Sequence, residues 1–278
     1  MRLLPWLPLA LVSALAGAVS ARGRLQPKDG VLKVNGPSDI VAVVARLLVD
    51  QGDRVAAGQV LAYTDTFEVR RAGVEKLKAQ IEAQEAALLA HEAELKRAES
   101  DDARKRPLAR QGVLAASDLD LVTRERDVAR ARLNEARLAV AATRAELASA
   151  AALRDLAVVR APFAGRVLKV HARPGEKIAA DGILSLGRAG GMYAVAQVYE
   201  TDVTRVRVGQ KARVRSPALA RELTGTVERI GLMVARLDAV ATEPAARVDA
   251  RIVEVEVRLD DPAAAEDLTG LEVDVLIP

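Results

Sequence analysis

The sequence predicts an elongated α+β protein, in which a β-domain is split by an antiparallel coiled-coil hairpin and followed by a small β-barrel. Three observations predict this architecture. A short motif occurs twice, a long stretch rich in Ala, Glu, Arg and Leu separates the copies, and runs of alternating apolar residues follow the second copy. The predicted boundaries are 22–66 and 157–188 for the split domain, 67–156 for the hairpin and 189–278 for the barrel.

The repeated motif is the clearest internal signal. Residues 46–61 and 169–184 align without a gap, and the alignment pairs Gly52 with Gly175, each followed by an acidic residue. Each copy reads as two short strands joined by a tight turn at the glycine. Half a sheet cannot bury its own apolar face. The two copies are therefore expected to pack together, although a long stretch of chain separates them.

The stretch from Phe67 to Leu156 predicts two long helices with a turn near residues 112–117. Its apolar residues recur at alternating spacings of three and four, which is the pattern of a coiled-coil seam. Two helices of about 40 residues would make a hairpin on the order of 60 Å long. Polar residues that interrupt the seam are interpreted as register-setting or solvent-facing. The predicted seam comprises Val74, Leu77, Ile81, Leu88, Leu95 and Ala98, then Leu119, Val122, Ala129, Leu133, Ala136, Val140, Leu147 and Ala150, with interruptions at Gln84, His91, Arg126 and Thr143.

The last ninety residues have the alternation of β-strands. We expect a small barrel with one short helix between strands, at 200–206. The predicted strands are 193–198, 211–214, 226–230, 252–257 and 271–277.

The N-terminal segment 1–21 predicts a membrane address. Arg2 precedes an apolar run that ends before Arg22, and Pro5 and Pro8 shorten its helical part. The run is marginal for a spanning helix, which needs about 20 apolar residues. Its small residues at 19–21 could form a signal-peptide cleavage site. A cleaved signal peptide and an uncleaved membrane anchor both remain open, and either places residues 22–278 outside the cytoplasm.

Composition excludes several classes of function. The net charge is only +3 and aromatic residues make up 2% of the chain, so the pattern of nucleic-acid binders is missing. The chain has no cysteine, and its two histidines, His91 and His171, lie far apart in the sequence. We expect no catalytic residues, no metal site and no cofactor. The sequence also lacks a phosphate-binding G-x-x-x-x-G-K-[ST] motif, so any ATP hydrolysis belongs to a partner.

The order of these elements resembles that of the HlyD-like membrane fusion proteins. The split β-domain looks like their biotinyl/lipoyl-like domain. The stretch 192–203, the residues Val206-x-Val208-Gly209-Gln210 and the stretch 249–255 are similar to the DevB branch, which serves ABC exporters. The resemblance covers roughly residues 22–278.

The resemblance implies a periplasmic adaptor associated with the inner membrane. Adaptors of this family join an inner-membrane ABC permease and its ATPase to a TolC-like outer-membrane channel, and they assemble into rings, here expected to be hexamers. The physical features agree with such a role, because a rigid hairpin can reach across the periplasm while the β-modules supply lateral surfaces for packing neighbours.

The resemblance also implies a docking surface for the channel at the hairpin tip. The family's tip carries an Arg, a Leu and a Ser at fixed spacing. In this sequence Arg104 and Leu108 match, and Gly112 occupies the turn position, but the third place is Ala115. Leu114 and Ser117, which lies two residues beyond the third place, are the candidates to complete the surface.

Other interpretations remain. The chain could be the adaptor of a proton-driven efflux pump, a biotinyl or lipoyl carrier, or a purely structural coiled coil. A carrier displays its modified lysine between the two half-motifs, where this chain places the hairpin. A passive coiled coil does not explain the two β-modules.

Overall fold

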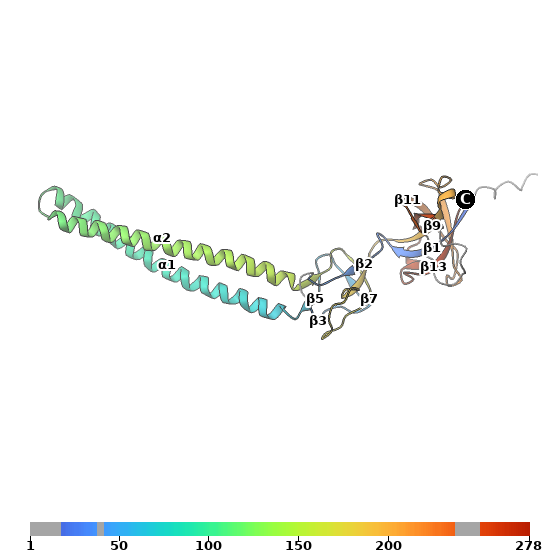
Figure 1. The fold of residues 1–278 in the computed structure, drawn as a ribbon, viewed down its shortest axis with the longest axis horizontal. Coiled ribbons are helices and arrows are strands. Elements are labelled where there is room, and N and C mark those ends of the chain that lie inside the picture. Colours follow the sequence, from blue (N-terminus) through green and yellow to red (C-terminus); the bar gives the residue numbers. More distant parts are fainter. Residues whose placement is uncertain (1–17, 38–41, 237–250) are drawn as a thin grey trace, which may run out of the picture.

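The computed structural model describes residues 18–37, 42–236 and 251–278. The molecule is elongated, with a helical hairpin at one end, a β-rich domain in the middle and a second group of strands at the other end (Figure 1). The mixed helix and strand content and the long hairpin confirm the predicted class. The predicted membrane address falls mostly on residues 1–17, which lie outside the described residues.

The middle domain is built from both sides of the hairpin. Its two small sheets have the strand orders β2-β8-β7-β4 and β3-β5-β6, and each order mixes strands from before and after the helices. The domain therefore forms only when the chain returns from the hairpin. Its strands are β2 (Val31–Val34), β3 (Val44–Leu47), β4 (Arg54–Val55) and β5 (Val60–Thr64), then β6 (Val158–Arg160), β7 (Gly165–Val170) and β8 (Leu184–Arg188).

The two copies of the repeat contact each other with near-twofold symmetry, as the repeat predicts. The amide of Gly52 donates to the Val167 carbonyl at 2.8 Å, and the amide of Gly175 donates to the Val44 carbonyl at 2.8 Å. Both glycines have positive φ, 97° and 90°, which a residue with a side chain rarely adopts. The spacing that the two copies share thus produces two equivalent backbone hydrogen bonds between them.

Apolar residues of both halves meet in one core. Leu61 comes from the first copy, and Ile183, Leu184 and Leu186 come from the second, and all four are fully buried. Burial of such side chains stabilises a fold by about 1.5–3 kcal/mol each. Neither half could bury this surface alone.

Six strands at the far end form a closed barrel, in the order β1-β13-β10-β11-β12-β9. A short helix, α3 (Glu200–Val203), follows β9, where a short helix was expected. The interior is filled with small and β-branched side chains, among them Ala194, Ala196 and Val198. The strands are β1 (Val19–Pro27), β9 (Met192–Tyr199), β10 (Lys211–Arg215), β11 (Leu223–Arg236), β12 (Arg251–Leu259) and β13 (Glu272–Ile277), and a single 3₁₀ turn, η1, covers Ala263–Ala265.

The strand β1 corrects two predicted boundaries. Residues 19–21 were assigned to the membrane address, and the barrel was expected to begin at residue 189, but Val19 pairs with Ile277 and is buried in the barrel. A cut after Ala21 would remove three paired residues from the strand. Gly23 is required by packing, because a Cβ there would lie 2.5 Å from the Val195 carbonyl oxygen. Within the described ranges, none of the helices combines the length and apolar character of a membrane span.

The hairpin enters and leaves the middle domain at one place. Its helices are α1 (Phe67–Arg110) and α2 (Ala116–Leu156). Just before α1, the amide of Thr64 donates to the carbonyl of Ala157, which directly follows α2, at 3.1 Å. The chain ends that the hairpin connects are therefore neighbours in the β-domain.

This geometry predicts that the β-domain folds without the hairpin. Replacement of residues 67–156 by a Gly/Ser turn of about 4 residues should leave the paired strands intact, because such a turn spans neighbouring antiparallel strands. We expect a β-rich circular dichroism spectrum and cooperative thermal unfolding. In the shortened chain Val167→Asp is the control, since it places a charge in the shared core and should abolish the transition. An unfolded product from the shortened chain itself would contradict the split-domain arrangement.

Candidate functional site

The hairpin is the most distinctive surface of the molecule, and its two helices pack along the predicted seam. Val74 and Ile81 of α1 are buried, as are Val122, Leu133 and Val140 of α2. With Ala129, which is also buried, the spacings are seven in α1 and seven, four and seven in α2, so the same stripe of each helix faces its partner. The seam prediction is confirmed at these positions.

One edge of the hairpin carries a regular row of ion pairs between the helices. Its members are exposed and recur every seven residues, so that each pair lies one heptad from the next. Exposed pairs contribute about 0–1 kcal/mol each, and their value lies mainly in setting register. The pairs are Glu85–Arg144 at 2.5 Å, Glu92–Arg137 at 3.1 Å and Glu99–Arg130 at 3.1 Å.

A buried charge cluster replaces apolar packing near the tip. Asp102 is 5% exposed and accepts hydrogen bonds from Arg106 at 2.7 Å, from Arg126 of the facing helix at 2.9 Å and from the hydroxyl of Thr123 at 3.2 Å. The hydrogen bond from Arg106 is the main cause that holds the pKa of Asp102 below its ordinary value, against the opposing effect of desolvation. The cluster ties α1 to α2 in one register.

Half of this cluster could be predicted from the sequence. Arg126 was interpreted as a register-setting interruption of the seam, and the structure confirms that reading through its bond to Asp102. Asp102 itself was missed, although it stands at the seam position seven residues after Leu95. Thr143, another predicted interruption, is buried and donates to the Ala139 carbonyl of its own helix at 3.1 Å.

The tip is a short turn between Arg110 and Ala116. Gly112 has φ of 71°, and the amide of Val113 donates to the Leu108 carbonyl at 3.0 Å. The turn was expected to extend to residue 117, but Ser117 already lies in the first turn of α2. The difference arises because no side-chain cap marks the start of that helix in the sequence.

The candidate docking residues lie around this turn in different environments. Arg104 is exposed and ion-paired with Asp101, and Leu108, one helical turn later, is 42% exposed. Leu114 is half-buried and Ser117 is exposed. Val113 was not predicted from the sequence. It is 73% exposed and adds a second exposed apolar side chain to the turn that follows Leu108.

Ala115 occupies the N-cap of α2. Its backbone is extended, with ψ of 147°, and no side chain caps the exposed amides of the first turn. The amides of Asp118 and Leu119 bond to the Ala115 carbonyl instead. The position at which the family carries a serine is therefore one at which serine would cap a helix.

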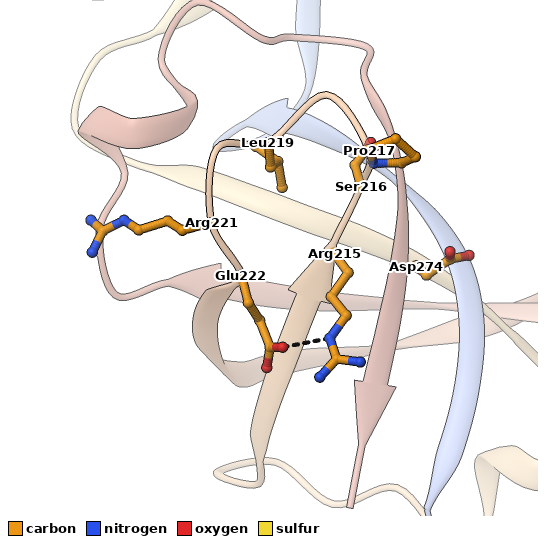
Figure 2. Close-up of a pocket in the computed structure, with 7 residues that line it drawn as sticks. All are labelled: Arg215, Ser216, Pro217, Leu219, Arg221, Glu222 and Asp274. Carbon is orange, nitrogen blue, oxygen red and sulfur yellow. Dashed lines mark hydrogen bonds and ion pairs between the residues drawn. The ribbon is translucent and has the colours of Figure 1, made fainter.

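The remaining polar features of the described residues are isolated contacts. His171 contacts the Ser185 hydroxyl at 2.8 Å, and His91 lies 3.3 Å from the carboxylate of Glu94. A pocket on the barrel contains Arg215, but its guanidinium is paired with Glu222 (Figure 2). Across the described part of the chain, three or more His, Asp or Glu side chains do not gather in a metal-binding arrangement.

The buried cluster leads to a prediction about pH. Asp102→Asn should lower the thermal stability of the hairpin at neutral pH, because it removes the charge that faces Arg106 and Arg126. The folded-state pKa of Asp102 is depressed, so its contribution is present above the ordinary pKa and is lost as pH falls through the folded value. The stability difference between the native chain and the variant, measured by circular dichroism melting, should therefore shrink in strong acid. Glu99→Gln, which breaks an exposed pair, is the matched control and should change stability little. An equal effect of both substitutions would show that Asp102 acts only as a surface charge.

The N-cap leads to a second prediction. Ala115→Ser should stabilise the chain by about 0.5–2 kcal/mol, because the serine hydroxyl can accept from a free amide of α2. Denaturant unfolding followed at 222 nm measures this change. Ala116→Ser, one residue inside the helix, offers the same hydroxyl without the cap geometry and should not stabilise. A stabilisation shared by both positions would contradict the N-cap assignment.

Comparisons with known proteins agree with this geometry. The chain is 29% identical over 202 residues to the macrolide export protein MacA of Escherichia coli O157:H7, a match that covers 71% of this chain and 53% of that protein. The chain thus spans about half the length of the curated relatives it matches. No protein-family model matches it.

Solved structures show the same fold. The crystal structure of MacA from Actinobacillus actinomycetemcomitans superposes with a TM-score of 0.73 at 16% identity, over 94% of this chain and 78% of that one. The membrane fusion protein Spr0693 of Streptococcus pneumoniae R6 superposes with a TM-score of 0.55 at 16% identity, over 94% and 98% of the two chains. The chain is thus similar in sequence to the macrolide export protein MacA, and it shares its fold with MacA and with a membrane fusion protein.

Proposed function

We propose that this chain is the periplasmic adaptor, or membrane fusion, subunit of a tripartite exporter. It links an inner-membrane ABC permease and its ATPase to a TolC-like outer-membrane channel. The observation that carries the proposal is the linear arrangement of the molecule, in which the hairpin tip and the barrel lie at opposite ends (Figure 1). A subunit of this shape can contact two partners that are far apart.

The two ends have the properties that such partners require. The α1 helix has 44 residues, which at 1.5 Å per residue makes it about 66 Å long. Its tip offers the exposed Arg104, Leu108 and Val113. At the other end, β1 follows the apolar stretch from Leu3 to Ala18, which supports a position of the barrel beside the inner membrane.

The finer assignments extend the same proposal. The stretches that resemble the DevB branch support an ABC exporter as the partner, and the relative MacA is named for macrolide export. The adaptors assemble into a ring, with a hexamer as the expected form, through the sides of the hairpin and the β-modules.

The protein carries out no catalysis of its own, since transport energy comes from the partner. A carrier role is disfavoured because the hairpin occupies the place between the half-motifs, and Lys169 lies within β7.

The tip provides the test. Arg104→Asp and Leu108→Asp should each reduce recovery of the outer-membrane channel with the affinity-tagged adaptor by about tenfold or more, because central charged and apolar anchors dominate interface energy. Recovery of the permease should not change, since it binds at the other end. The measurement is quantitative mass spectrometry of complexes purified from the organism's own membranes.

The control comes from the same helix. Arg97 is exposed and lies seven residues before Arg104, so Arg97→Asp makes the same charge reversal on the same face of α1, away from the tip. It should leave channel recovery intact. Unchanged recovery of the channel with both tip variants would show that Arg104 and Leu108 do not bind the channel. Recovery of a permease that lacks an ATPase subunit would instead favour the proton-driven pump.

A further inference from the structure

The barrel carries an irregularity on β11 that its own fold does not require. Strand β11 pairs with β12 from Gly225 to Arg236, but the register shifts between two pairs, Ile230 with Val255 and Val234 with Val253. Between these pairs, residues 231–233 of β11 lie opposite a single residue of β12. This is a β-bulge, a feature that re-aims side chains at the rim of a sheet.

A glycine makes the bulge possible. A Cβ on Gly231 would lie 2.9 Å from the Glu254 carbonyl oxygen, so a larger residue would push the two strands apart. The two residues that follow are turned outward. Leu232 is fully exposed and Met233 is 80% exposed, and the adjoining Val234 is half exposed. We call Leu232, Met233 and Val234 the bulge patch.

The barrel register places the bulge patch in one row with the first half of β1. Glu254, opposite the bulge, pairs with Gln197 of β9, and Gln197 pairs with Arg22 of β1. Arg22 is three residues from Val19, where β1 begins. The opposite end of the barrel, at Pro27 and Met192, connects to the middle domain. The bulge patch therefore lies in the same row of paired residues as Arg22, within the first half of β1 and away from the hairpin.

The chain upstream of β1 identifies what lies beside this row. From Leu3 to Ala18 the sequence contains no charged residue, and β1 begins at Val19 without a linker. A segment of this composition partitions into a bilayer, and the lack of a linker keeps the barrel within a few residues of it. This step rests on the membrane-associated location in the proposed function.

We propose that the bulge patch inserts into the interfacial region of the lipid bilayer. Its side chains are aliphatic, which suits the boundary between headgroups and acyl chains. Arg22 is exposed in the same row and provides a cation for anionic headgroups. Arg251, two residues along β12 from Val253, is also exposed, but its guanidinium lies 3.9 Å from the carboxylate of Glu200. A second protein copy is a poorer occupant, because three side chains fall far short of the roughly 800 Å² per partner of a stable interface.

The absence of cysteine from the chain makes a direct test possible. The full chain, carrying either Leu232→Cys or Met233→Cys, is labelled with an environment-sensitive fluorophore and bound to vesicles of phosphatidylethanolamine and phosphatidylglycerol. Both labels should shift to shorter emission wavelength, and nitroxide lipids that place the quencher just below the headgroups should quench them. Both native side chains are exposed, so the substitutions should leave the fold unchanged, which circular dichroism checks.

Val208→Cys is the matched control. Val208 is a 64% exposed aliphatic residue of the same barrel, and the next residue, Gly209, donates to the carbonyl of Val227, which pairs with Val257 nearer the middle domain. Its label should stay open to aqueous iodide and show no lipid quenching. Labels at 232 and 233 that behave like the one at 208, on a chain that does bind vesicles, would overturn the inference while leaving the proposed function standing.

Two other results would also overturn it. If the labels at 232 and 233 become protected without vesicles, in proportion to protein concentration, the bulge patch contacts a second copy. If the full chain fails to bind the vesicles at all, both the inference and the membrane-associated location fail.

Discussion

The structure depends on the backbone hydrogen bonds that the two copies of the repeat exchange. Gly52 reaches Val167 and Gly175 reaches Val44, so each copy completes the other. Because the domain needs both copies, the chain between them must leave and return to nearly the same point, at Thr64 and Ala157. An antiparallel hairpin is the helical structure that meets this constraint. The direction in which the hairpin projects is set by the same contacts, and so is its separation from the barrel.

The base of the hairpin is held by contacts that continue this arrangement into the helices. Arg46 of β3 pairs with Glu68 at 3.1 Å and stacks on Tyr63, while Arg70 donates to the Leu153 carbonyl of the other helix. The ion pairs along the edge and the buried Asp102 cluster then carry one register to the tip. An apolar seam rich in alanine would permit sliding by one heptad, and the exposed row, which repeats every seven residues, would then re-form two of its three pairs. The single contact between Asp102 and Arg126 is the one that distinguishes these registers. The tip residues thus keep a defined position relative to the β-domain.

The barrel is joined to the middle domain more weakly than the hairpin is. Two segments of the described chain cross between them, and the side-chain contacts include the ion pairs Arg54–Glu266 at 3.0 Å and Arg166–Asp267. Pairs of this kind contribute about 0–1 kcal/mol each. These ion pairs therefore add little to the connection between the two modules.

The sequence by itself determined the parts that depend on local periodicity. The spacing of apolar residues shows the repeat, the coiled-coil seam and the alternating strands. These patterns predict the split domain, the hairpin and most barrel strands. It also indicated Arg104 and Leu108, whose role as a docking site stays a prediction. Other features arise from partners distant in sequence, and only the tertiary structure decided them. The residues of β1 look like the end of an apolar address until they meet β13, some 250 positions away. Asp102 is an ordinary surface acid until the helix register places Arg126 beside it, and Leu232 and Met233 turn outward only because three residues of one strand face a single residue of its neighbour.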